Sequence, residues 1–229
     1  MANRKSFSEV KETVLAAHKD VDPEGKVKFY DSWADNYEQD VETLEYRAPY
    51  LAAETLSSAF QGNRDLAVIL DVACGTGLVV SWLHKMGFRN FHGIDGSEGM
   101  LEMAKTKGLY QNLKCCMLGT ETLSSPISFY DAVLLVGALS VGHVPVEVIW
   151  ELCKVTKPGG YICMTTRANN TNIHYKDQLE SLQRSMEEKG LWKKIAVREV
   201  EKWERAVSES DCVYISGVVY LYRKTCVES

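Results

Sequence analysis

The apolar side chains of the N-terminal part of the chain recur at the spacing of α-helices. Residues 6–19 carry an apolar stripe on one face, and a serine near the start is a suitable cap. Similar patterns predict a second helix over residues 24–37 and a third over about residues 47–60. We therefore expect a helical segment, residues 1–62, ahead of any strand.

From residue 66 the pattern changes to short β-rich runs that alternate with helical segments. Strands are predicted at residues 67–71, 91–95, 113–118, 130–136 and 161–166. Helices are predicted between them at residues 78–86, 97–107 and 145–156. Alternation of this kind is typical of parallel strands that are joined by right-handed crossovers. The pattern predicts an α/β fold, with a doubly wound sheet as the core of residues 63–229.

The end of the chain departs from simple alternation. A helix near residues 175–189 precedes two predicted strands, 193–206 and 211–223, with only the turn-forming stretch 208–211 between them. So short a connection favours an antiparallel hairpin. Together with the five parallel strands, the hairpin gives a mixed sheet of seven strands. Because the chain shows no repeat or linker, we expect one domain over residues 1–229.

The charge balance and the lack of long apolar runs narrow the classes of partner. Lys and Arg number 26 against 31 Asp and Glu, a formal net charge of −5, and this balance disfavours a nucleic-acid polyanion as the main partner. The first residues lack the apolar core of a signal peptide, and no run approaches the roughly 20 apolar residues of a membrane span. We expect an intracellular monomer of the cytoplasm, the nucleus or both, without membrane attachment.

The seven cysteines lack the CxxC spacing of a zinc site or a redox pair. Cys115 and Cys116 are adjacent in a predicted strand, where neighbouring side chains face opposite ways and cannot easily form a disulfide. We expect reduced, mostly buried thiols, as in a reducing compartment. No metal site is predicted.

Residues 66–80 carry the strongest functional signal, because a buried strand there leads into a glycine-rich turn and then a helix. Gly75 and Gly77 flank Thr76, and the absent side chains allow backbone N–H groups to approach a ligand closely. A dinucleotide site would carry a third glycine where Val80 stands, and no lysine follows at the spacing of an ATP-binding loop. The turn is therefore predicted to bind another kind of ligand.

Two acidic residues narrow the choice of ligand. Asp95 ends the second predicted strand, where a carboxylate can accept both hydroxyls of a ribose. Asp71 ends the first strand beside the turn, where it would oppose a pyrophosphate but suit a cationic group. The alternative is that each acid only caps the turn or helix that follows it. Taken together around one glycine turn, the two acids predict a nucleoside with a positive charge.

Four segments resemble the motifs of class I S-adenosylmethionine-dependent methyltransferases, in the right order. They are Asp71-Val-Ala-Cys-Gly-Thr-Gly77, Gly93-Ile-Asp-Gly-Ser-Glu-Gly-Met100, Tyr130-Asp-Ala-Val133 and Lys157-Pro-Gly-Gly160. The resemblance covers about residues 25–225. It implies a Rossmann-like fold, S-adenosylmethionine as cofactor and S-adenosylhomocysteine as product.

The resemblance also implies roles for particular residues. Asp95 would hold the ribose, and Met100 or Gly96 would lie near adenine. Asp71 would contact the methionine ammonium directly or through water. The turn after the first strand would pack against the amino-acid part of the cofactor, and the residues after the fourth strand would run along it. These turn and strand-end residues are Ala73, Gly75, Thr76, Gly77, Val136, Gly137 and Ala138.

The chain departs from the family pattern after the third predicted strand. Many relatives have Asp-Ala-Glu-Asp-Leu there, with the first aspartate accepting from the adenine amino group. The corresponding residues are Gly119-Thr-Glu-Thr-Leu123, and a glycine has no such acceptor. We expect the backbone N–H of Thr120 or the side chain of Glu121 to serve adenine instead.

Aromatic residues and a histidine are candidates for the place where methyl transfer occurs. Residues 29–37 resemble a Tyr-Asp-x-Trp-Ala-x-x-Tyr segment that precedes the cofactor domain in many relatives. Tyr30, Trp33 or Tyr37 either cover the sulfonium as part of a helical lid or join the helix to the sheet, and Tyr37 is also a catalytic candidate. His143 is either a general base or a capping or packing residue.

The acceptor of the methyl group stays open. An in-line displacement from an activated donor needs alignment and exclusion of water, so a base is optional. No Asn-Pro-Pro-Tyr signature, paired acids or metal cluster identifies an acceptor, and Arg167 and His174 either meet an anionic one or are solvated. The main hypothesis is methyl transfer to a small molecule, with a protein acceptor also open. The alternatives are a cofactor-binding scaffold without catalysis and, more distantly, a nicotinamide oxidoreductase.

Overall fold

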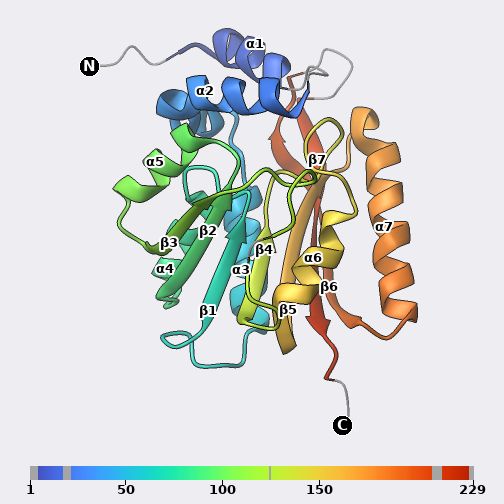
Figure 1. Cartoon of the computed structure of the whole chain (residues 1–229). Coiled ribbons are helices and arrows are strands. Elements are labelled where there is room, and N and C mark those ends of the chain that lie inside the picture. Colours follow the sequence, from blue (N-terminus) through green and yellow to red (C-terminus); the bar gives the residue numbers. More distant parts are fainter. Residues whose placement is uncertain (1–4, 18–21, 124, 208–212, 227–229) are drawn as a thin grey trace.

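A seven-stranded mixed sheet forms the centre of the computed structural model, which describes residues 5–17, 22–123, 125–207 and 213–226. The strand order is β3-β2-β1-β4-β5-β7-β6 (Figure 1). Strands β1 to β5 are parallel, and β7 is antiparallel to both β5 and β6. The strands are β1 (Val68–Val72), β2 (Asn90–Asp95), β3 (Tyr110–Cys115), β4 (Tyr130–Leu135), β5 (Thr156–Arg167), β6 (Trp192–Arg205) and β7 (Tyr214–Lys224).

Helices cover both faces of the sheet and cross one of its ends. The α3 and α4 helices bury their apolar sides on one face, and α6 and α7 do so on the other. The α1 and α2 helices lie across the end where the parallel strands finish (Figure 1). The helices are α1 (Phe7–Ala17), α2 (Pro23–Thr43), α3 (Ala48–Ala59), α4 (Leu78–Lys85), α5 (Glu98–Thr106), α6 (Val148–Val155) and α7 (Ile173–Glu188), with a 3-10 turn at Asn170–Asn172.

The predicted doubly wound sheet and its antiparallel hairpin are confirmed, although several boundaries differ. The α2 helix continues to Thr43, beyond the predicted end at residue 37, because buried Asp40 and Val41 give its last turns a face to pack. The β3 strand begins at Tyr110 rather than residue 113, since its largely exposed side chains hide the strand pattern. The predicted turn 208–211 lies outside the described residues.

The ends of the helices near the site are set by local sequence. Asp22 caps α2 by accepting a hydrogen bond from the Gly25 N–H at 2.7 Å, with a proline at the first helical position. Ser97 caps α5 by accepting from the Met100 N–H at 3.1 Å. Gly77 precedes α4 with a φ of 86°, a conformation that disfavours other residues. These three caps fix how the chain enters the helices around the carboxyl end of the sheet.

The N-terminal helices divide into two groups by packing. The α3 helix belongs to the layer that covers the sheet, where it packs with α4. The α1 and α2 helices instead share a small apolar cluster of their own, which includes Val10, Val14, Trp33 and Leu44. Within residues 1–62, α1 and α2 therefore lie over the carboxyl end, whereas α3 is part of the core.

No disulfide joins the cysteines in the described part of the chain. Cys115 ends β3 with an exposed side chain, and the next residue, Cys116, is buried. The two side chains therefore lie in opposite environments, as expected for neighbours in an extended segment.

Candidate functional site

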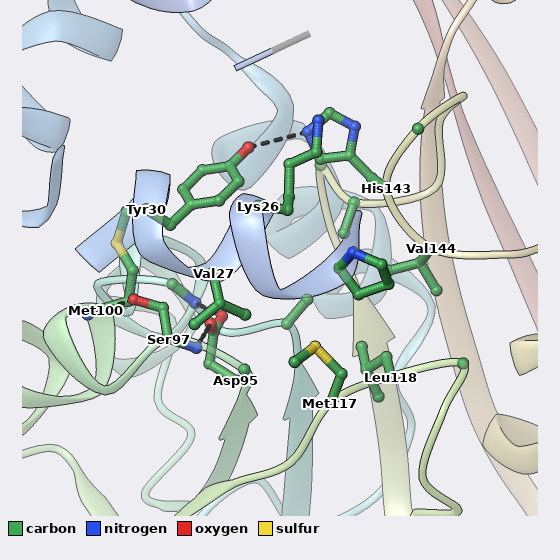
Figure 2. Close-up of a pocket in the computed structure, with 18 of the residues that line it drawn as sticks. Lys26, Val27, Tyr30, Asp95, Ser97, Met100, Met117, Leu118, His143 and Val144 are labelled. Atoms are coloured by element: carbon green, nitrogen blue, oxygen red, sulfur yellow. Dashed lines mark hydrogen bonds between the residues drawn. The ribbon is translucent and has the colours of Figure 1, made fainter. Parts of the chain in front are cut away.

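A cavity of about 430 Å³ lies beneath α2, at the carboxyl ends of β1, β2 and β4 (Figure 2). The turn after β1, the end of β2 and the segment after β4 all contribute to its wall. Ligands of open α/β sheets bind at this end of the strands. The predicted site residues that line the cavity are Tyr30, Tyr37, Ala73, Gly75, Asp95, Gly96, Met100, Thr120, Val136, Gly137, Ala138 and His143.

Asp95 is held in the cavity wall by backbone donors. Its Oδ2 accepts from the Gly75 N–H at 2.8 Å, and its Oδ1 accepts from the Ser97 N–H at 2.9 Å. Burial raises the pKa of this carboxyl, and the N–H groups of Ser97 and Gly75 oppose the rise. Ser97, rather than Asp95, supplies the cap of α5. Each carboxylate oxygen keeps a further lone pair, so Asp95 can still accept from a ligand.

Asp71 lies behind the glycine turn and has a partner on β3. Its carboxylate is 1% exposed and accepts from the Tyr110 hydroxyl at 2.7 Å. Burial raises the pKa of Asp71 to about 7, against the opposing effect of the Tyr110 hydrogen bond. A Cβ on Gly77 would lie 3.0 Å from the Tyr110 ring, and a Cβ on Gly93 would lie 2.8 Å from Cε1 of the same ring. These two glycines therefore leave room for the ring that reaches Asp71.

A small cavity of about 40 Å³ connects Asp71 with the main site. Asp71 lines this small cavity, and Tyr37, Ala73, Gly75 and Val136 line both cavities. The Asp71 carboxyl therefore lies next to the wall that the two cavities share. The structure places Asp71 beside the main cavity rather than in its wall.

Hydrogen bonds tie α2 to the glycine turn and to α5. The Thr76 hydroxyl donates to Glu38 on α2 at 2.7 Å, and Lys107 pairs with the same carboxylate at 2.5 Å. Asp31, also on α2, accepts from the Ser97 hydroxyl at 2.6 Å. Thr76 is 1% exposed and does not line the main cavity. Its position beside the site serves to hold the helix over the turn.

Two further predicted residues lie outside the main cavity. Trp33 is buried in the α1–α2 cluster, where its Nε1–H donates to Asp40 at 2.8 Å. Glu121 is exposed and accepts from the Met117 N–H at 3.1 Å, so it stabilises the loop after β3. Trp33 packs in this cluster and lines a smaller neighbouring cavity, while Tyr30 and Tyr37 reach the main cavity.

Gly119 is explained by packing against the loop before α6. Its φ is +87°, and a Cβ there would lie 2.7 Å from the Cδ of Pro145. An aspartate at this position would therefore be strained and would collide with the proline ring. Thr120 lines the cavity nearby, and its backbone N–H donates to the Met117 carbonyl at 3.4 Å.

His143 faces α2 across the cavity and is joined to Tyr30 (Figure 2). Its Nε2 lies 3.0 Å from the Tyr30 hydroxyl, and its Nδ1 lies 3.1 Å from the Ser140 hydroxyl. Burial, followed by the nearby Lys26 ammonium, lowers the pKa of His143 to about 4. The imidazole is therefore uncharged at neutral pH and a weak base, so these contacts orient Tyr30.

Sequence reasoning missed the apolar side chains that line the cavity beside Asp95. They are Val27 on α2, Met117 and Leu118 after β3, and Val144 before α6 (Figure 2). Val27 lies in a helix that the sequence predicted, but only the packing of α2 shows which face meets the site. Together they form an apolar surface suited to a flat, uncharged ring.

A second cavity, of about 70 Å³, adjoins the main one and was not predicted. Both cavities are lined by Tyr30, Tyr37, Gly137 and His143. Glu204, near the end of β6, lines the second cavity, and burial raises the pKa of its carboxyl to about 7. No local signal marks Glu204, because it is one of several charged residues in a strand at the sheet edge.

The described ranges hold neither a membrane-spanning helix nor a cluster of metal-ligating side chains. No helix there is long and apolar enough to cross a membrane. No group of three or more His, Cys, Asp or Glu side chains among those residues is placed to hold a metal ion.

The doubly wound sheet and the cavity at its carboxyl end define a Rossmann-like methyltransferase fold, and comparisons with known proteins agree. A model of the methyltransferase domain matches residues 70–164. The chain is 51% identical to Methyltransferase-like protein 27 of Homo sapiens over 197 residues, which cover 86% of this chain and 80% of that protein. The chain belongs to this methyltransferase family.

Solved structures show the same fold at low sequence identity. A putative methyltransferase in complex with the Haloferax volcanii Trm112 activator has a TM-score of 0.62 and 13% identity, over 86% of this chain and 98% of that chain. An S-adenosylmethionine-dependent methyltransferase from Thermotoga maritima has a TM-score of 0.58 and 17% identity, with the same two coverages.

Proposed function

We propose that this chain uses S-adenosylmethionine to methylate a small molecule. The proposal rests on one arrangement: Asp95 is fixed by the glycine turn in the wall of the main cavity, and Asp71 is reached through an adjoining pocket. One carboxylate suits a ribose and the other suits an ammonium group. Their placement around a single turn supports a nucleoside that carries an amino acid.

The chemistry of the lining residues fits the parts of this cofactor. Asp95 would accept from the ribose hydroxyls, and the turn residues Ala73 and Gly75 would border the methionine chain. Asp71 would pair with the ammonium through the small cavity. The adenine ring would lie among apolar side chains, with the Thr120 backbone at its edge. The apolar side chains are Val27, Met100, Met117 and Leu118.

In this proposal the chain mainly orients the reactants and excludes water. Bound S-adenosylmethionine would supply a methyl group already activated on a sulfonium sulfur. Tyr37 lines all three cavities, so its ring would border the reacting centre on the α2 side. Tyr30, oriented by His143, would close the same side. We propose α1 and α2 as the lid of the site, since both helices lie across the end of the sheet that holds the main cavity and α2 lines it (Figure 1).

Calorimetric titration of the full chain with S-adenosylmethionine and S-adenosylhomocysteine tests the cofactor. We expect both to bind, and Asp95→Asn to weaken both about 100-fold, because charge-assisted hydrogen bonds to the ribose are lost. Glu102→Gln, an exposed change on α5, is the matched control and should bind as the unaltered chain does. Absence of heat with either compound at high micromolar concentration would overturn the proposal.

Labelled methyl transfer to a small-molecule extract separates catalysis from binding alone. We expect label in the small-molecule fraction with the unaltered chain and a large loss with Asp95→Asn. Label confined to protein would replace the small-molecule acceptor by a protein. Tight cofactor binding with no transferred label would instead support a catalytically silent scaffold.

A further inference from the structure

The second cavity lies beside the main one, on the side of β5 and β6. It adjoins the main cavity at the segment after β4, where Gly137 and His143 line both cavities, so a molecule bound in it would lie next to a molecule bound in the main cavity. Its phenolic and charged lining comes from α2, the α2–α3 connection, β5 and β6. The side chains concerned are Tyr30, Tyr37, Tyr46, Arg167 and Glu204, and further polar lining comes from Ser140, His143, Thr165 and Thr166.

Glu204 is placed by an irregularity in β6 and by hydrogen bonds on both sides of it. The pairing of β6 with β7 shifts register just before Glu204, and such irregularities re-aim side chains. The carbonyl of Trp203 accepts from the Arg47 N–H at 3.1 Å, and the Arg205 N–H donates to the Leu44 carbonyl at 2.8 Å. The backbone around Glu204 is therefore fastened to the end of α2 and the start of α3.

The charged and titratable groups of this cavity act on one another. Burial is the first cause that raises the pKa of Tyr30, Tyr37 and Tyr46, and the charge of Glu204 adds to the rise for all three. Burial likewise raises the pKa of Glu204 to about 7, while the Arg167 guanidinium opposes the rise. Near neutral pH, Glu204 can therefore exchange a proton, which the three tyrosines cannot.

His143, which also lines this cavity, is less suited to receive a proton. Its pKa is lowered to about 4 by burial and by Lys26. Both ring nitrogens already have partners, the Tyr30 hydroxyl and the Ser140 hydroxyl. Glu204 is the better-matched base for chemistry at neutral pH, since a base is most effective when its pKa is near the operating pH.

We propose, on the basis of the proposed function, that the second cavity binds the nucleophilic nitrogen of a small amine and that Glu204 is the catalytic base that receives its proton. A carboxylate acceptor would meet the like charge of Glu204 and would need no base. A neutral alcohol is a much weaker nucleophile toward the methyl carbon than a neutral amine. Arg167 disfavours a second cation beside it and so opposes the positive charge that ionised Glu204 would favour on the amine.

The reaction balances without a further reactant. The nitrogen lone pair of the neutral amine forms a bond to the methyl carbon, while the carbon–sulfur bond breaks and its electron pair stays on sulfur. The nitrogen thereby gains a positive charge, and its N–H proton passes to the Glu204 carboxylate. The products are a neutral thioether, a neutral methylated amine and protonated Glu204, which releases its proton to solvent.

Methyl transfer to ethylamine, with ethanol and acetate as probes of similar size, tests the acceptor class. We expect S-adenosylhomocysteine to form faster with ethylamine only. Glu204→Gln should lower this rate about 100-fold, and Glu204→Asp should restore part of it. S-adenosylmethionine binding should change less than twofold. Glu201→Gln, an exposed change on the same strand, is the matched control.

The protonation of Glu204 supplies a readout that does not depend on turnover. In the complex with S-adenosylhomocysteine, a 13C-labelled glutamate carboxyl should titrate near pH 7 and be missing from Glu204→Gln. Amine turnover in the unaltered chain should fall as pH drops through the same range, because Glu204 becomes protonated.

Three results would overturn this proposal. They are unchanged ethylamine turnover in Glu204→Gln, preference for acetate or ethanol, and titration of every glutamate below pH 5. Failure of the unaltered chain to bind the cofactor would instead contradict the proposed function, on which this proposal rests.

Discussion

Asp71 is buried and Glu204 is half-buried. Removal from water raises the pKa of each carboxyl to about 7, yet their surroundings differ. Asp71 ends a central parallel strand and accepts from the neutral hydroxyl of Tyr110. Glu204 lies near the end of an outer antiparallel strand, beside the Arg167 guanidinium and facing a cavity. The pKa is raised to a similar value in two different environments. The environment, rather than the pKa, indicates which carboxyl can take part in catalysis.

The different surroundings of the two carboxyls suit them to different roles at the site. Asp71 has a fixed hydrogen-bond partner and reaches the site through a pocket of only about 40 Å³, so it can pair with a ligand charge but has little room for a reacting group. Glu204 lines a cavity of about 70 Å³ that adjoins the proposed cofactor site. We therefore assign cofactor charge recognition to the Asp71 region and proton transfer to the Glu204 region.

The largest expected effect on stability is in the Glu204 region. Trp203 precedes Glu204, and its indole occupies the space that a Cβ on Gly217 would need. Gly217→Ala should lower the free energy of unfolding by about 2–3 kcal/mol, because the buried indole must move. Denaturant unfolding measures this change. Gly62→Ala, which would contact only the movable end of the Phe60 ring, should cost under about 0.5 kcal/mol. Equal losses in the two variants would contradict a tightly fixed β6 end.

The Asp71 region can be tested by removing a single hydroxyl. Tyr110→Phe leaves a buried carboxyl without its donor, so it should lower the free energy of unfolding by about 1.5–3 kcal/mol at pH 8, where Asp71 is ionised. At pH 5 the loss should be smaller, because Asp71 is then protonated. Tyr50→Phe removes an exposed hydroxyl that donates to Glu54 at 2.6 Å, and should have little effect at either pH. A loss that does not change with pH would contradict the assigned role of Asp71.

The smallest predicted effect concerns the pH dependence of cofactor affinity. Because the pKa of Asp71 is about 7, its carboxyl is protonated at pH 5.5 and increasingly ionised as the pH rises. An ammonium group favours the ionised form, so S-adenosylmethionine affinity should rise up to about tenfold from pH 5.5 to 7. Calorimetry on the unaltered chain and on Asp71→Asn measures this rise, which the variant should lack.

5′-Methylthioadenosine provides the matched ligand for this test. It keeps the adenine and the ribose but has no ammonium, so its affinity reports the nucleoside contacts, including those of Asp95, without the proposed contact to Asp71. The difference in pH dependence between the two ligands isolates Asp71. Identical pH profiles for both would remove the proposed contact between Asp71 and the ammonium.

The alternating core and its glycine turn could be predicted because their signals are local. A buried strand, an acidic residue at its end and the glycines after it all lie within residues 66–80. Asp95 ends a different strand, but it could be assigned to the same site because a parallel arrangement brings the carboxyl ends of strands to one edge of the sheet. The lining of the cavity by Asp95 and Gly75 agrees with this prediction.

Other members of the site depend on contacts that the local pattern does not contain. Gly77 has the sequence of a ligand-binding glycine, but the Tyr110 ring from β3 lies against it. Trp33 and Tyr37 share one helix and both are aromatic, yet only Tyr37 reaches the main cavity. The rotation of α2 about its axis decides which of the two side chains faces the cavity. That rotation depends on the contacts of Asp31 and Glu38 with segments distant in the sequence.

The sequence by itself determined the α/β class, the order of helices and strands along the chain and the family resemblance that points to S-adenosylmethionine. It could do so because periodicity and motif spacing are short-range properties. Tertiary structure decided that Asp71 pairs with Tyr110, that Gly119 makes room for Pro145 and that Glu204 faces a cavity beside Arg167. These features depend on residues far apart in the chain. Their burial, and with it their pKa and chemistry, exists only when the helices and the hairpin pack around the same end of the sheet.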